Sequence, residues 1–148
     1  ATPGGSVPSL VGEGKMSKSK GGTIILTDSL EEIKGVLAKV TTDSGKGEKF
    51  PDSGPLANLI TFVELFEGHD RAMQYKEMYK VSGIKYKELK EELAEAIYKE
   101  LKPIQERRKY YEEHPQEVEQ ILEDGKNYAK KIADETLREV REKMGLIN

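Results

Sequence analysis

Lysines, serines and glycines are concentrated in one short stretch near the start of the chain. Residues 12–21 read Gly-Glu-Gly-Lys-Met-Ser-Lys-Ser-Lys-Gly. Lysine carries a compact positive charge on a flexible stem, serine donates hydrogen bonds, and glycine lets backbone N–H groups approach a ligand closely. Together these properties suit a polyphosphate whose charge shifts during a reaction. We call residues 12–21 the lysine loop and interpret it as a candidate phosphate-binding segment, with a solvated basic linker as the alternative.

Two groups of basic residues later in the chain are candidate RNA contacts. They are Arg107, Arg108, Lys109, Lys126, Lys130 and Lys131. Tyrosines adjoin both groups, and single-stranded bases stack on aromatic rings while lysines hold the phosphates. Ordinary surface charge is the alternative interpretation. The remaining tyrosines favour a packing role.

Other chemistry finds little support in the residue types. The two histidines, His69 and His114, lie far apart and beside expected helix ends, which favours capping or surface positions. Glutamates between residues 88 and 123 are typical of a solvated helix face paired with lysines. The chain has no cysteine, which excludes disulfides, thiolate catalysis and cysteine zinc sites. We therefore predict no metal site.

The elements that must position these residues are mostly helical. Apolar residues recur at helical spacing in five stretches, which predict helices over 28–40, 56–66, 71–80, 86–114 and 116–144. Asp28 has the position of an N-cap, with Glu31 as its capping-box partner. Pro103 predicts a kink or break in the fourth helix, and Gly145 an end to the last. The expected fold class is an all-α bundle of about five helices, preceded by a Gly/Lys-rich loop and with room for one short strand at 23–26.

Bulk composition agrees with this class. At 148 residues, with 36% hydrophobic and 34% charged residues, the chain suits one modest core surrounded by amphipathic helices. A net charge of -3 means that any RNA contact needs a local basic patch. No apolar run is long enough to cross a bilayer and no signal peptide precedes the loop, so we expect a cytoplasmic protein without membrane contact. Residues 1–6 contain no initiator methionine and read as a tag remnant or the middle of a longer gene.

The order of residues in the lysine loop matches a known signature. Lys15-Met16-Ser17-Lys18-Ser19 resembles the KMSKS motif of class I aminoacyl-tRNA synthetases. Further segments resemble the bacterial tryptophanyl-tRNA synthetase family in the same order along the chain: Thr42-Asp43, Leu56–Ile60, Leu101–Arg107, Leu122–Gly125 and Val140–Leu146. Two positions depart from the family pattern, Gly22 where asparagine is frequent and the segment 11–14 where Thr-Asp-Gly is frequent.

This resemblance implies a division of labour within a longer parent enzyme that joins tryptophan to its tRNA using ATP. Residues 1–27 would be the lysine-loop end of a catalytic domain, and residues 28–148 a helical anticodon-binding domain. The implied ATP-binding residues are Lys15, Met16, Ser17, Lys18 and Ser19. Lys15 and Lys18 would be catalytic, stabilising the charge that builds on the leaving pyrophosphate.

The resemblance also implies partners. ATP with Mg²⁺, tryptophan and tRNA-Trp are expected for the full-length enzyme, which would be a homodimer, and DNA is not expected. The Rossmann fold and the tryptophan pocket are missing from this chain, so we expect it alone to be inactive and monomeric or weakly associating. Two alternatives remain open, a fragment of a tyrosyl-tRNA synthetase and a non-catalytic helical module that binds RNA or protein.

Overall fold

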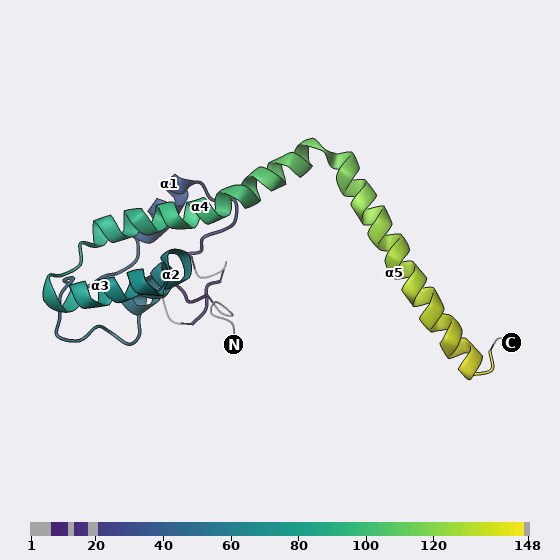
Figure 1. Cartoon of the computed structure of the whole chain (residues 1–148), viewed down its shortest axis with the longest axis horizontal. Helices are drawn as coiled ribbons and strands as arrows, with labels where there is room; N and C mark the ends of the chain where they lie inside the picture. Colours follow the sequence, from purple (N-terminus) through teal and green to yellow (C-terminus); the bar gives the residue numbers. More distant parts are fainter. Residues whose placement is uncertain (1–6, 12–13, 18–20, 147–148) are drawn as a thin grey trace. The chain divides into compact units, whose positions relative to one another are not determined.

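The computed structural model describes residues 7–11, 14–17 and 21–146. Within them the chain forms five helices and no strand, so the all-α class is confirmed (Figure 1). The helices are α1 (Leu30–Ala38), α2 (Pro55–Glu67), α3 (His69–Val81), α4 (Tyr86–Glu113) and α5 (Pro115–Lys143). Residues 23–26 form no strand in the described part of the chain and lead into a turn at 25–28, which corrects the option of a short strand there. No helix of that part is long and apolar enough to span a membrane.

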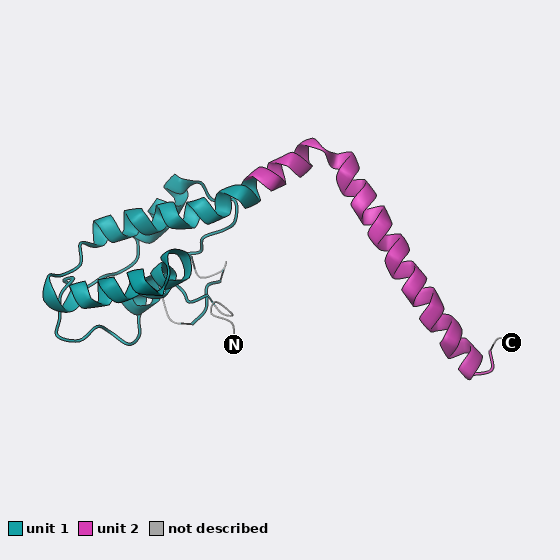
Figure 2. Cartoon of the chain, in the orientation of Figure 1, with its two compact units in different colours: residues 1–105 teal, residues 106–148 magenta. Residues whose placement is uncertain are grey.

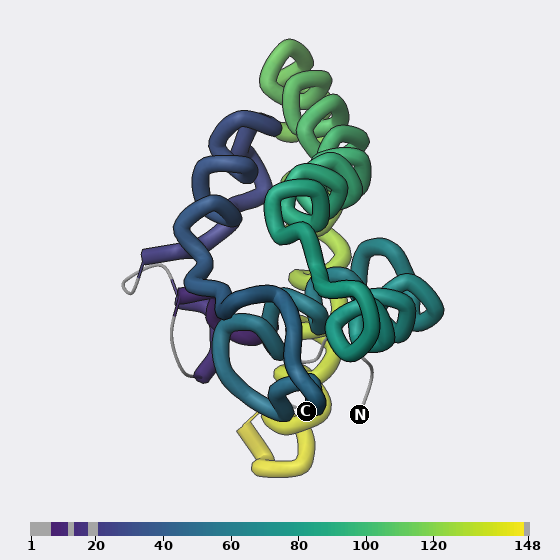
Figure 3. The backbone as a smooth tube through the Cα atoms, turned by 90° about the vertical axis from the view of Figure 1, so that its left-hand side faces the viewer, coloured from purple at the N-terminus to yellow at the C-terminus, as the bar shows by residue number. Residues whose placement is uncertain are grey.

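The chain divides into two compact units, residues 1–105 and residues 106–148 (Figure 2). The core lies in the first unit. There α1 and α4 lie above α2 and α3 in both views of the backbone (Figures 1 and 3). Fully buried side chains at its centre are Leu10, Ile33, Leu37, Leu59, Val63, Leu89 and Leu93. The division at residue 105 differs from the one expected after residue 27, which stays a prediction about the parent protein.

Helix α1 begins one residue later than its sequence pattern suggested. Two overlapping capping boxes are available, and the structure uses Ser29 with Glu32 rather than Asp28 with Glu31. The Ser29 hydroxyl accepts from the Glu32 N–H, and the Glu32 carboxylate accepts from the Ser29 N–H at 2.8 Å. The prediction of Asp28 as the cap is wrong because the Asp28 carboxylate accepts a hydrogen bond from the preceding backbone, at Ile25.

Glycine and proline determine the other helix boundaries. Gly68, with φ of 96°, ends α2, and α3 starts directly at His69 rather than at Arg71 as expected. Only glycine adopts such a φ without strain, so the chain reverses within one residue. Pro103 lies inside α4 and does not break it, which rules out the break among the two outcomes expected there, a kink or a break. His114 takes the N-cap position of α5 and Pro115 its first position, one residue before the start expected at residue 116.

The second unit is dominated by α5, none of whose described residues is buried. Its sequence is amphipathic, and large apolar side chains on it are strongly exposed: Ile121, Leu122, Tyr128, Ile132, Leu137 and Val140. The sequence pattern thus predicts the helix correctly without specifying what covers its apolar face.

Candidate functional site

The described part of the lysine loop stands on a short hairpin. The Met16 N–H donates to the Val7 carbonyl at 2.8 Å, and the Ser9 N–H donates to the Gly14 carbonyl at 2.8 Å. The Lys15 side chain is exposed between these bonds. These two hydrogen bonds hold the backbone on either side of Lys15 and so fix the direction in which its side chain extends into solvent. A cation held in a fixed direction is well placed to meet an anionic ligand.

Burial attaches this hairpin to the helices. Leu10 is 0% exposed and belongs to the same core as α1, α2 and α4, and Met16 is half-buried against that core. On α2, the Asn58 side-chain amide donates to the Ser9 carbonyl at 2.8 Å. The segment before the lysine loop is therefore part of the helical unit.

The segment after the lysine loop is held in a similar way. The Thr23 hydroxyl donates to the Ser17 carbonyl at 2.8 Å. On α4, the Gln105 amide donates to two carbonyls, those of Leu26 at 3.0 Å and Asp28 at 2.9 Å. Sequence reasoning missed both amides, because these bonds join residues 49 to 79 positions apart.

The predicted ATP-binding residues divide into two groups. Lys15, Met16 and Ser17 lie on the hairpin, with Lys15 exposed and Met16 and Ser17 half-buried. Lys18 and Ser19 lie outside the described residues. The described members include one exposed lysine ammonium, a point charge that suits a phosphate group.

A second polar cluster centres on Asp43, in the linker between α1 and α2. The carboxylate accepts from the hydroxyls of Tyr79 and Tyr86, each at 2.5 Å, and from the Gly45 N–H at 2.8 Å. Some loss of hydration pushes the pKa of the exposed Asp43 upward, but these three hydrogen bonds outweigh it and the pKa lies below its usual 3.8. The sequence marked Asp43 only through its family segment. The structure shows that it ties the linker to α3 and α4.

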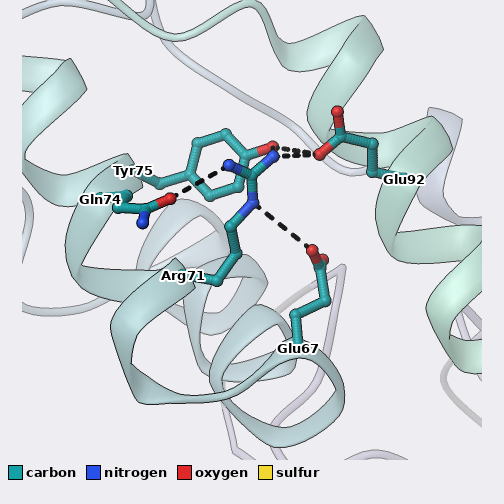
Figure 4. Close-up of polar contacts among 5 residues, drawn as sticks. All are labelled: Glu67, Arg71, Gln74, Tyr75 and Glu92. Carbon is teal, nitrogen blue, oxygen red and sulfur yellow. Dashed lines mark hydrogen bonds and ion pairs between the residues drawn. The ribbon is translucent and has the colours of Figure 1, made fainter.

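A third cluster, formed by Glu67, Arg71, Tyr75 and Glu92, joins α2, α3 and α4 (Figure 4). The Arg71 guanidinium pairs with the Glu92 carboxylate, lies 4.7 Å from the centre of the Tyr75 ring, and approaches Glu67 at 3.6 Å. Its hydrogen bond, together with one from the Tyr75 hydroxyl, holds the pKa of Glu92 below its usual value. Glu67 is the weakly satisfied member, because its Oε1 is buried and finds no partner among the described residues. Burial therefore raises the pKa of Glu67 despite the nearby guanidinium.

The six predicted RNA contacts all lie in the second unit and are all exposed: Arg107, Arg108, Lys109, Lys126, Lys130 and Lys131. Three of them form ion pairs one helical turn away, Arg108 with Glu112, Lys109 with Glu113 and Lys126 with Glu123. The consecutive residues 107–109 point around α4 about 100° apart, since a turn takes 3.6 residues. The structure does not bring the six onto one face, and their role stays a prediction.

The two histidines occupy helix starts. His69 lies 2.8 Å from a Glu64 carboxylate oxygen, and the His114 ring stacks on Tyr110 with centroids 4.2 Å apart. In the described ranges no group of three histidine, aspartate or glutamate residues is placed to hold a metal ion.

Comparison with known proteins identifies what the site is similar to. The model of the family described as tRNA synthetases class I (W and Y) matches residues 2–102. The tryptophan–tRNA ligase of Wolinella succinogenes is 36% identical over 137 residues, which are 90% of this chain and 41% of that protein. The tryptophan–tRNA ligase of Clostridium longisporum is 33% identical over 145 residues, which are 96% of this chain and 42% of that protein.

A solved structure agrees with these relatives. Tryptophanyl-tRNA synthetase from Campylobacter jejuni, complexed with ADP and tryptophan, matches with a TM-score of 0.74 at 28% identity, over 95% of this chain and 43% of that one. The chain thus spans about two fifths of the length of the relatives that it matches.

Proposed function

Because this chain belongs to the class I tRNA synthetases of the tryptophan and tyrosine family, we propose that it supplies the lysine loop and the helical tRNA-binding part of a tryptophan–tRNA ligase. The observation that carries the proposal is the match of the lysine loop and its helical support, in order, to ligases named for tryptophan. That naming disfavours the tyrosine alternative. A non-catalytic module is disfavoured by the intact lysine signature.

In this proposal the lysine loop serves the activation of tryptophan by ATP. Lys15 and Lys18 stabilise the negative charge that develops on pyrophosphate as the adenylate forms, and Ser17 and Ser19 donate hydrogen bonds. Met16 serves mainly by packing the hairpin on the core, as its partial burial indicates. Mg²⁺ arrives with ATP, bound chiefly by phosphate oxygens and water.

The helices bind the anticodon arm of tRNA-Trp. Exposed cations of the second unit supply phosphate contacts, and Tyr128, 71% exposed on α5, offers a ring on which a base can stack. Homodimerisation of the full-length ligase, a cytoplasmic location and the inactivity of this chain alone remain predictions.

A fluorescence-anisotropy titration tests the RNA half of the proposal. The chain is titrated with a tRNA-Trp anticodon stem-loop at two salt concentrations, against a stem-loop whose anticodon is scrambled. We expect tighter binding to the CCA anticodon at both salts, and a salt slope reduced by about one in Lys130→Ala if that lysine binds a phosphate. Equal affinity for both stem-loops would refute anticodon reading by this chain.

A further inference from the structure

Two amide side chains hold the main chain on the two sides of the lysine loop. Asn58 of α2 donates to the carbonyl of Ser9, before the loop, and Gln105 of α4 donates to the carbonyls of Leu26 and Asp28, after it. We propose that Asn58 and Gln105 are positioning residues, which set where the described part of the lysine loop, residues 14–17, stands on the helical unit. Neither touches a lysine, so each would act through the backbone that carries Lys15.

The upstream anchor acts through one continuous set of contacts. Asn58 fixes the Ser9 carbonyl, the Ser9 N–H closes the hairpin on Gly14, and Lys15 follows directly. Ser9 is buried and its neighbour Leu10 fully so. Because the Ser9 N–H is bonded to the Gly14 carbonyl, we expect a displacement at Ser9 to pass through that hydrogen bond to Gly14 and so to Lys15.

The anchor after the lysine loop, Gln105, makes two hydrogen bonds. One Gln105 amide group reaches two carbonyls on the turn at 25–28, and the Asp28 carboxylate completes that turn by accepting from the Ile25 N–H at 2.9 Å. Asp28 itself is buried. Since Gln105 lies on the same helix as the core residues Leu93 and Leu101, this turn is fixed relative to the core.

The relevance of Asn58 and Gln105 to ATP rests on the proposed function. Their effect on the position of the hairpin can be measured without ATP. Trypsin binds its substrate as extended, unpaired backbone, so we expect it to cut after Lys15 only when the Met16 N–H leaves the Val7 carbonyl. The rate of cleavage at Lys15–Met16 in the native 148-residue chain therefore reports local opening of the hairpin. Opening of that kind is insensitive to low urea, whereas cleavage through global unfolding accelerates with urea.

The variants Asn58→Asp and Gln105→Glu keep the side-chain shape but remove the donor. We expect each to raise the urea-insensitive cleavage rate roughly three- to tenfold, the factor expected for losing one ordinary hydrogen bond. Matched changes on α5, Asn127→Asp and Gln120→Glu, should leave the rate within about twofold, because those amides bond only exposed carboxylates on their own helix. If Asn58→Asp and Gln105→Glu are cleaved at the wild-type rate, the amides do not hold the hairpin and the proposal is overturned. If cleavage accelerates only with urea, the amides contribute only to the overall stability of the chain, and the proposal is overturned as well.

A chimera separates this inference from the proposed function. In it, the chain replaces the matching two fifths of the Wolinella succinogenes ligase. Asn58→Asp and Gln105→Glu should lower kcat for ATP–pyrophosphate exchange and leave KM for tryptophan unchanged. Faster cleavage with unchanged exchange would confirm the anchors and contradict the role of the loop in ATP chemistry.

Discussion

Replacing Leu10 with alanine tests whether the segment before the lysine loop belongs to the helical core. Leu10 is 0% exposed and belongs to the buried core to which α1, α2, α3 and α4 contribute. The change removes three carbon atoms, which accounts for about 2.4 kcal/mol at about 0.8 kcal/mol per buried methylene. The cavity left behind adds to this, so the expected loss of unfolding free energy is about 3 kcal/mol, within the range of buried leucines.

The loss should appear as a large shift of the unfolding transition. For a unit of this size about 3 kcal/mol lowers Tm by roughly 12–24 °C. Near-ultraviolet circular dichroism is the suitable signal, because the chain has no tryptophan and its buried tyrosines, Tyr75 and Tyr79, lie in the same unit as Leu10.

The neighbouring Val11 provides the control, because it is 40% exposed. Val11→Ala should change the unfolding free energy by no more than about 0.5 kcal/mol. If Leu10→Ala shifts Tm no further than Val11→Ala, the segment before the loop does not pack in the core, and the reasoning about how the loop is positioned fails.

Three further changes probe other parts of the structure. Glu67→Gln should raise the unfolding free energy at pH 7 by up to about 1 kcal/mol. Burial raises the folded-state pKa of Glu67 above 4.5, so the stability that this carboxyl contributes to the wild-type chain is present below pH 4.5 and is lost as pH rises. Thermal unfolding at pH 4.5 and at pH 7 should show this loss in the wild-type chain and not in Glu67→Gln. Asp43→Asn should destabilise the chain by about 1 kcal/mol at pH 7, a modest value because the carboxylate is exposed. Since the folded-state pKa of Asp43 lies below 3.8, this difference should be full well above pH 3.8, decline below it and be lost as pH falls through the folded-state pKa; a difference in denaturant titrations that does not shrink with falling pH would contradict the hydrogen-bond account. Gly125→Ala should stabilise α5 by about 1 kcal/mol, because an added Cβ meets nothing within 4 Å; far-ultraviolet circular dichroism that shows no gain in helix would contradict this.

Periodicity and local chemistry were sufficient to predict the helices. The core positions of α4, Leu89, Leu93, Ile97 and Leu101, are buried as their spacing predicts. One error lies where two local solutions compete, at the overlapping capping boxes of Asp28 and Ser29. Local sequence offers both caps, and only the distribution of hydrogen bonds in the folded chain decides between them.

The candidate site was predictable in its residue types but not in its supports. The lysine signature is contiguous, so sequence alone points to it, whereas Asn58 and Gln105 reach it from two distant helices. Likewise Tyr79 and Tyr86 meet Asp43 only after the linker folds back. Contacts between distant residues leave no period in the sequence, and a lone amide is indistinguishable from a surface residue.

ATP–pyrophosphate exchange by the chimera tests the central claim most directly, that this chain supplies the lysine loop of a tryptophan–tRNA ligase. The measurement compares the unsubstituted chimera with Lys15→Ala and Lys18→Ala, with Lys87→Ala, an exposed lysine of α4, as the control. The account predicts tryptophan-dependent exchange that falls about 100-fold or more in each loop variant, as when a charge-stabilising donor is removed, and is unchanged in Lys87→Ala. An active chimera whose exchange rate stays within about twofold in both loop variants would contradict it.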